Sequence, residues 1–283
     1  MTFNTKIIGI LNYTPDSFSD GGKFFTVDKG IKQAEYLIDG GADIVDVGAE
    51  SGKPRYIYES DDTLTTQEEE WKRLESILPQ VIEIAHSRNV QVSVDTRNAK
   101  TAEKALALNA DIINDCTGLH DPNMISVLKN SNAKILISHN LGVPLIKGNF
   151  IPKGKNPINE IISWLEDRTQ KLIDGGISRD RIIVDPGIGI GKNGMQSLYI
   201  MQNIDKLKIL KYPICLGHSR KSCFMPFASH DSTRDNATLV TSTILFYKNI
   251  DFFRVHNVHI HSEAFGLLKK MPQITLKDVY DSL

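Results

Sequence analysis

Short apolar runs in this chain repeatedly end on a polar residue. The runs are rich in isoleucine and valine, and the polar residues at or just after their ends include Asn12, Asp95, Asn114, Asp185 and Arg254. Runs of this kind followed by helical patterns are typical of buried parallel strands. When parallel strands close into a barrel, their C-terminal ends meet at one mouth, where polar side chains serve chemistry rather than packing. The sequence therefore predicts one polar site at the mouth of a barrel.

Eight units of a strand followed by a helix can be placed along the chain, as an α/β fold of the (β/α)8 TIM barrel type requires. The chain has 283 residues, of which 41% are hydrophobic and 24% charged, so it can bury one sizeable core. We therefore predict a single domain over residues 1–283. The expected strands lie near residues 6–12, 43–47, 91–95, 111–114, 133–138, 181–185, 213–217 and 251–255.

Local signals predict where some helices begin and end. The first helix should stop at Gly40-Gly41, and Thr66 stands three residues before Glu69, the spacing of a capping box. Pro79 should kink or split the second helix. The connections over residues 13–26, 51–65 and 140–156 are long and polar, and they leave strand C-termini. They are candidate lids over the site, although ordinary loops fit the same pattern.

Charge and cysteine content limit the function classes. A formal net charge of -1 gives no reason to expect nucleic acid or an anionic membrane as partner. We find neither a secretory leader nor a window of 18 apolar residues, so we expect a cytoplasmic protein. The three cysteines, Cys116, Cys215 and Cys223, lack C-x-x-C spacing. This favours reduced thiols over a disulfide framework or a zinc site.

Seven blocks, in order along the chain, make the functional prediction specific. They are Gly9–Gly22, Gly41–Gly48, Ser93–Thr96, Ile113–Asp115, Asp185–Lys192, Ser219–Ser222 and Arg254–His256. With these blocks the chain resembles dihydropteroate synthase over essentially its whole length. The first block and the Ser-Arg-Lys-Ser block are the most diagnostic, because corrinoid-linked pterin methyltransferases share the barrel and the pterin pocket but generally lack both.

The resemblance implies a transferase of folate synthesis that acts on small molecules. Such enzymes join 6-hydroxymethyl-7,8-dihydropterin diphosphate to p-aminobenzoate, forming 7,8-dihydropteroate and pyrophosphate, and they are targets of sulfonamides. In a dissociative substitution negative charge grows on the diphosphate while the pterin methylene becomes cationic. The protein then needs anion binding and pterin recognition rather than a covalent nucleophile. The resemblance also implies Mg²⁺ and a homodimer.

The anion end of the site is expected where the last strand meets the first. Arg254 and His256 are two residues apart, so both side chains should point to the same side, where they can donate to phosphate oxygens. Asn12 can give a carbonyl oxygen to Mg²⁺, which binds mainly through phosphates and water. A rim salt bridge is the alternative for Arg254. A zinc cluster of His256, His259 and His261 would lack a companion carboxylate or cysteine set.

The pterin end needs hydrogen-bond acceptors, because the pyrimidine edge of a pterin presents an amino group beside a ring N–H. The resemblance implies acceptors at Asp95, Asn114 and Asp185, a catalytic donor at Lys221, packing of Arg220 on the ring, and Ser222 on the p-aminobenzoate carboxylate. Asp46 and Glu50 are candidates for supporting roles. Lys221 could also suggest a Schiff-base aldolase, but nothing else in the chain points to carbonyl chemistry. The glycines at 187, 189 and 191 do not have Walker spacing, so we expect a tight turn near the pterin.

The loop after the second strand departs from the family pattern. The family usually reads Gly-Gly-Glu-Ser-Thr-Arg-Pro-Gly, whereas this chain has Gly-Ala-Glu-Ser-Gly52-Lys53-Pro54-Arg. Gly52, Lys53 and Pro54 would then adjoin p-aminobenzoate. Lys53 would also keep a charge for pyrophosphate without the bidentate fork of arginine, and a shifted Arg55 is the alternative. Two functions follow: an active synthase with altered p-aminobenzoate and sulfonamide contacts, or a pterin-binding paralogue that turns over poorly. A pterin-dependent corrinoid methyltransferase is a third reading.

Overall fold

The computed structural model describes residues 4–14, 26–50, 65–142, 146, 148–228 and 230–273. Within them, strands and helices alternate as the sequence predicts. The strands are β1 (Lys6–Asn12), β2 (Ile44–Gly48), β3 (Gln91–Asp95), β4 (Ile112–Asp115), β5 (Lys134–Ser138), β6 (Ile182–Asp185), β7 (Cys215–Leu216) and β8 (Phe252–Val255). The α-helices are α1 (Val27–Asp39), α2 (Gln67–Ser87), α3 (Ala99–Ala107), α4 (Met124–Lys129), α5 (Pro157–Asp174), α6 (Gly194–Gln202), α7 (Asp231–Phe246) and α8 (Val258–Lys270).

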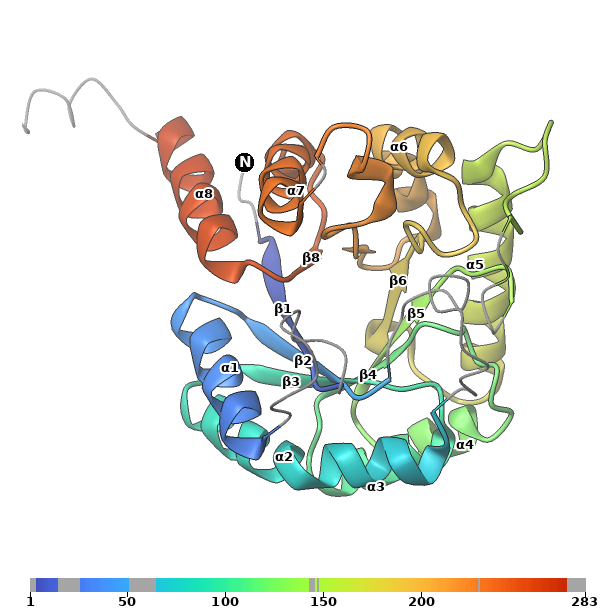
Figure 1. The fold of residues 1–283 in the computed structure, drawn as a ribbon. Coiled ribbons are helices and arrows are strands. Elements are labelled where there is room, and N and C mark those ends of the chain that lie inside the picture. The colour runs from blue at the N-terminus through green and yellow to red at the C-terminus, as the bar shows by residue number, and fades with distance from the viewer. Residues whose placement is uncertain are drawn as a thin grey trace, which may run out of the picture.

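The eight strands form one parallel sheet that closes on itself. Their order is β6-β5-β4-β3-β2-β1-β8-β7, and a bridge between Val184 and Ile214 joins β6 to β7. The helices surround the strands (Figure 1). The predicted (β/α)8 barrel is thereby confirmed.

Two layers of inward-facing side chains determine where the site lies. The lower layer is an apolar floor made of Ile8, Ile44, Ile112, Leu136, Ile183, Cys215 and Phe252. Successive strand residues point to opposite faces, so the residue two positions further along each strand also points inward. These next residues include Asp46, Asn114, Ser138, Asp185 and Arg254. A polar layer therefore sits directly on a dry apolar floor, at the C-terminal mouth.

The outward faces of the strands pack against the helices and form the main core. The predicted capping box of α2 is confirmed: Thr66 accepts from the backbone of Glu69, and the Glu69 side chain accepts from that of Thr66. Helix α1 ends at Asp39 with Gly40 as its C-cap, as predicted. Of the kink or split expected at Pro79, the split is wrong. Helix α2 continues through it, because Pro79 is exposed while the neighbouring apolar residues on both sides are buried in the core.

Other expectations concern the loops and thiols. All three cysteines are free. In the part of the chain that the structure describes, no helix has the length and apolar character needed to cross a membrane. Most residues of the first two candidate lids, 15–25 and 51–64, lie outside the described ranges, as do 143–145 and 147 of the third.

Candidate active site

An arginine between two carboxylates occupies the centre of the polar layer. The Nε of Arg254 donates to Asp46 Oδ2 at 2.6 Å, and its Nη2 donates to Asp95 Oδ2 at 2.8 Å. Burial alone would lower the pKa of Arg254, but the two carboxylates outweigh it and raise the pKa. Burial raises the pKa of Asp95 to about 7, although the Arg254 charge opposes this shift. The guanidinium is therefore permanently charged and anchored from strands β2 and β3.

Asn114 extends this cluster with a hydrogen-bond acceptor. Its Nδ2 donates to Asp46 Oδ2 at 3.1 Å, which leaves its carbonyl oxygen Oδ1 available. The thiol of Cys116 lies 3.5 Å from Asp95 Oδ1 and 3.6 Å from Asn114 Oδ1, so it can donate weakly to either oxygen. Asp95 and Asn114 thus present oxygen atoms side by side from adjacent strands, which is what a row of N–H donors on a flat ring requires.

Asp185 lies at the end of β6. Its Oδ1 accepts from the Gly187 N–H at 2.5 Å and its Oδ2 from the Gly217 N–H at 3.0 Å. Burial raises the pKa of Asp185. Burial, with the Arg254 charge next, lowers the pKa of Lys221. A Cβ at Gly189 would lie 3.2 Å from the Lys221 Cδ, so the glycine loop approaches this lysine closely.

The loop after β7 carries the Ser-Arg-Lys-Ser block. Arg220 adopts a left-handed conformation, with a φ of 56°, and its guanidinium forms a bidentate pair with Asp235 at 2.7 and 2.8 Å. The backbone N–H of Arg220 donates to Thr238 Oγ1, so α7 holds this turn in place. Ser222 begins a short 3-10 helix, η4 (Ser222–Phe224), and is exposed. The turn therefore directs Arg220 toward α7, whereas Lys221 faces the buried cluster.

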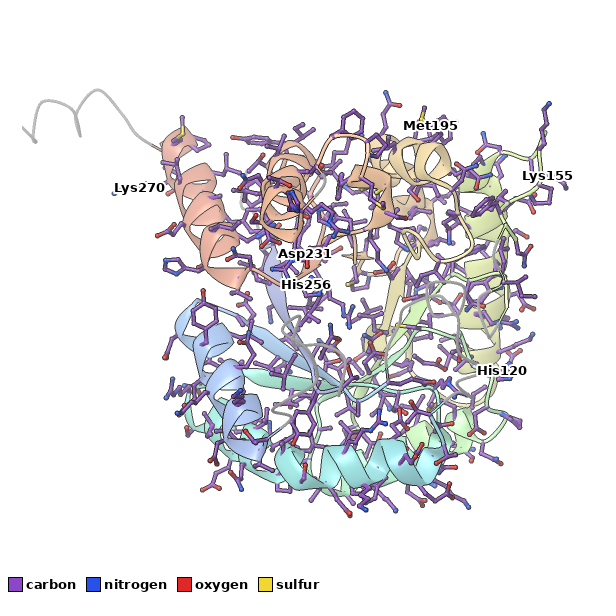
Figure 2. All side chains as sticks on the ribbon, in the orientation of Figure 1. His120, Lys155, Met195, Asp231, His256 and Lys270 are labelled. Carbon is purple, nitrogen blue, oxygen red and sulfur yellow. The ribbon has the colours of Figure 1, made fainter. Side chains whose placement is uncertain are left out.

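His256 directly follows β8, two residues after Arg254. Figure 2 labels it. Its Nδ1 lies 2.9 Å from Ser219 Oγ, and its backbone N–H donates to that oxygen at 3.2 Å. Burial and the nearby charges of Arg220, Arg254 and Lys221 lower the pKa of His256 to about 3. It is therefore a neutral imidazole at physiological pH.

The remaining predicted positions do not belong to the central cluster. Asn12 ends β1 and is exposed at the mouth. Gly52, Lys53 and Pro54 lie outside the described residues. The three histidines near the chain's end are in separate surroundings, since His259 pairs with Glu263 and His261 with Ser242. Among the described residues, no group of three or more histidine, cysteine or carboxylate side chains could hold a metal ion.

Sequence reasoning gave no role to the pair of Lys192 and His139. The buried Lys192 Nζ donates to His139 Nδ1 at 2.7 Å, to His139 O at 3.0 Å and to Ile190 O at 2.8 Å. Burial lowers the pKa of Lys192 well below its usual range, and burial followed by the Lys192 charge lowers that of His139 to about 2. The pair ties the glycine loop after β6 to the end of β5. The sequence signals were the lysine that closes the glycine block and the place of His139 just after the fifth apolar run.

Comparison with known proteins identifies the family. The profile of the family described as pterin binding enzyme matches residues 8–256. A dihydropteroate synthase of Clostridium beijerinckii is 39% identical over 263 residues, covering 92% of this chain and 91% of that protein. The crystal structure of dihydropteroate synthase from Anaplasma phagocytophilum with bound 6-hydroxymethylpterin-monophosphate has a TM-score of 0.85 and 47% identity, with 95% and 99% coverage. That of the Clostridium difficile enzyme, determined in the presence of pteroic acid, has a TM-score of 0.83 and 31% identity, with 96% and 98% coverage.

These similarities define first a class and then a family. The chain is a pterin-binding enzyme of the TIM-barrel fold. Within that class it belongs to the dihydropteroate synthase family, whose members are transferases.

Proposed function

We propose that this chain condenses 6-hydroxymethyl-7,8-dihydropterin diphosphate with p-aminobenzoate to give 7,8-dihydropteroate and pyrophosphate. The observation that carries the proposal is the layer of buried and half-buried carboxylates, amide and cations at the barrel mouth, where Asp95, Asn114 and Asp185 can accept from a pterin. The relative from Anaplasma phagocytophilum was solved with a hydroxymethylpterin monophosphate, which is a ligand of the chemistry expected here.

The two ends of the proposed substrate differ in charge, and so do the two sides of the site. The buried acceptors suit the neutral pterin edge, and Lys221 can donate to its ring carbonyl. Arg254 and His256 provide donors for the diphosphate, whose negative charge grows as the C–O bond loosens. No covalent nucleophile is required, because the pterin methylene cation is resonance-stabilised.

We propose Mg²⁺ as the metal, bound chiefly by the diphosphate. The donor set fits this ion, because Mg²⁺ takes hard oxygen ligands and commonly keeps several waters beside substrate phosphates. Asn12, exposed at the mouth, offers one amide oxygen. When bound, the metal would neutralise charge on the leaving pyrophosphate.

The second substrate is proposed from the family. Ser222 is exposed on the loop after β7, where its hydroxyl can donate to a carboxylate of p-aminobenzoate. The relative from Clostridium difficile was solved in the presence of pteroic acid, which contains both ring systems. A sulfonamide would compete for the same place. We also propose that the enzyme works in the cytoplasm, where its three free cysteines would stay reduced.

The test follows both products at once. The purified chain is given the pterin diphosphate, p-aminobenzoate and Mg²⁺, and pyrophosphate and dihydropteroate are measured together. We expect equal amounts of both, lost in Asp185→Asn and Arg254→Ala. Pterin binding without turnover would show the noncatalytic paralogue instead, and methylation that depends on a corrinoid would show the methyltransferase.

A further inference from the structure

We infer that Ser219 is a positioning residue for the proposed reaction: it holds His256 in the tautomer protonated on Nε2 and so provides an N–H donor for the diphosphate. The inference rests on the proposed function for the identity of the anion. The tautomer itself follows from hydrogen bonds within the chain, and it can be tested without turnover.

The hydrogen bonds of Ser219 decide where its proton lies. Ser219 is buried, and its Oγ accepts the backbone N–H of His256 at 3.2 Å. The hydroxyl proton still needs an acceptor, and the Nδ1 of His256 lies 2.9 Å away. If Nδ1 carried the proton, the serine hydroxyl would be left buried with no acceptor among the described residues. Full satisfaction of these groups therefore requires Ser219 to donate and Nδ1 to accept.

The protonation state of His256 completes the assignment. Burial and the charges of Arg220, Arg254 and Lys221 keep its pKa near 3, so the ring carries one proton at neutral pH. With Nδ1 as the acceptor, that proton must be on Nε2. Within the ranges that the structure describes, Nε2 has no hydrogen-bond partner, and the residue is partly exposed. The ring thus offers a neutral donor among three cations, which together suit an anion.

A second set of hydrogen bonds fixes the loop that carries Ser219. The neighbouring His218 lies 2.9 Å from Ser242 Oγ, which lies 3.0 Å from Nε2 of His261. His261 donates from Nδ1 to the Asn257 carbonyl at 2.8 Å, and as a neutral ring it must accept on Nε2. His218 therefore donates to Ser242, Ser242 donates to Nε2 of His261, and His261 donates to the Asn257 carbonyl. Together with Ser219 and His256, these hydrogen bonds tie the loop after β7 to the end of β8 at two places.

The direct test is the tautomer of His256. The protein is labelled with ¹⁵N-histidine, the ring signals are recorded by ¹⁵N–¹H correlation at neutral pH, and a His256→Gln variant assigns them. We expect the Nε2–H form in the wild type and in Ser219→Thr, which keeps the hydroxyl. In Ser219→Ala the Nδ1–H form should become populated. Ser197→Ala is the matched control, because Ser197 is a buried serine whose hydroxyl has no partner among the described residues.

Kinetics then test the consequence. Loss of one hydrogen bond to a charged leaving group should lower kcat in Ser219→Ala by about 10- to 100-fold, with Ser219→Thr restoring it and the KM for p-aminobenzoate unchanged. A wild-type His256 that is Nδ1–H or doubly protonated would overturn the inference, as would an unchanged tautomer in Ser219→Ala. A changed tautomer with unaltered kcat would overturn the positioning role. A wild type with the expected tautomer but no pyrophosphate release would contradict the proposed function and leave the tautomer assignment standing.

Discussion

Arg254 carries the electrostatic balance of the barrel mouth. Its guanidinium forms ion pairs with both Asp46 and Asp95, and Asp46 is buried, with only 1% of its surface exposed. Removing one partner of a buried ion pair leaves an uncompensated charge, which costs far more than the pair itself contributes. The same guanidinium is the proposed anion donor, so its effects on stability and on turnover must be separated experimentally.

For Arg254→Met we expect the free energy of unfolding to fall by about 3–5 kcal/mol, because two carboxylates lose their counterion. Adding Asp46→Asn should recover part of the lost free energy of unfolding, because one unpaired carboxylate is removed. It should not recover pyrophosphate release, since the proposed anion donor is still missing. Urea denaturation and the product assay measure the two effects. An Arg254→Met protein as stable as the wild type would contradict this account of the cluster.

Individual residues show how far the sequence could predict the site. Polar residues at strand ends interrupt the apolar runs of the sequence. This pattern placed Asn114 and Asp185 at the ends of their strands, and the structure has them there. Asp46 was harder, because its part in the cluster depends on pairing with Arg254, which is 208 residues away. Such a contact follows from barrel closure and side-chain geometry, which local spacing does not encode. The roles of Gly52 and Lys53 remain predictions.

At the scale of elements, strand positions were predictable because buried parallel strands have a distinctive composition. The seventh strand is the instructive exception. Residues 213–217 were expected, whereas β7 covers only Cys215–Leu216. Pro213 has no N–H to donate to a ladder, although its carbonyl accepts from Val184 at 3.0 Å. At Pro79, by contrast, the proline does not end the element. Helix α2 continues through it, because the residues on both sides are packed in the core.

The glycine loop between β6 and α6 depends on its backbone shape. Gly187 has a φ of 67°, and a Cβ there would lie 2.0 Å from the His139 carbonyl oxygen. We expect Gly187→Ala to destabilise the protein by more than the 1–2 kcal/mol of left-handed strain alone, because the clash is with backbone. Gly194→Ala in α6 is the matched control, since its Cβ would meet only Cys223 Cα at 3.6 Å, and it should be neutral or stabilising by up to about 1 kcal/mol. Equal unfolding free energies for both variants would refute this explanation.

The hydrogen-bonded series of His218, Ser242 and His261, which connects the loop after β7 with α7 and α8, predicts that the stability of the protein depends on pH. Burial, followed by the charge of His261, lowers the pKa of His218 to about 4, from 6.5. The unfolded chain therefore binds more protons between these values, so the contribution is present above pH 6.5 and is lost as pH falls toward 4. At pH 5, where most but not all of this window has been crossed, His218→Gln should remove about 2 kcal/mol of the acid-dependent loss. Urea denaturation of both proteins at pH 7.5, 6 and 5 measures it, and parallel pH profiles would contradict it.

At the scale of the whole molecule, one part of the barrel exterior leaves large apolar side chains exposed. Helix α7 carries Val240 and Ile244 on one face, and Tyr247 follows as its C-cap residue. The 3-10 helix η4 packs against α6 and α7 and is followed by Phe227. Phe227 is 73% exposed and Ile244 is 64% exposed. Helices α6 and α7 lie on the same side of the barrel (Figure 1). Large apolar side chains exposed on neighbouring elements commonly mark an interaction site, and these are consistent with the homodimer that the resemblance implies.

We therefore expect the wild type to sediment as a dimer at micromolar concentration, and the double variant Phe227→Ser, Ile244→Lys to raise the dissociation constant at least tenfold. A buried lysine charge and a lost aromatic contact both oppose association, whereas neither side chain takes part in the barrel core. Ile209→Lys is the matched control, because Ile209 is 69% exposed in η3 (Ile204–Leu210), outside this patch. Analytical ultracentrifugation with circular dichroism separates dissociation from unfolding. A monomeric wild type, or dissociation of the Ile209→Lys variant alone, would place the dimer contact elsewhere or exclude it.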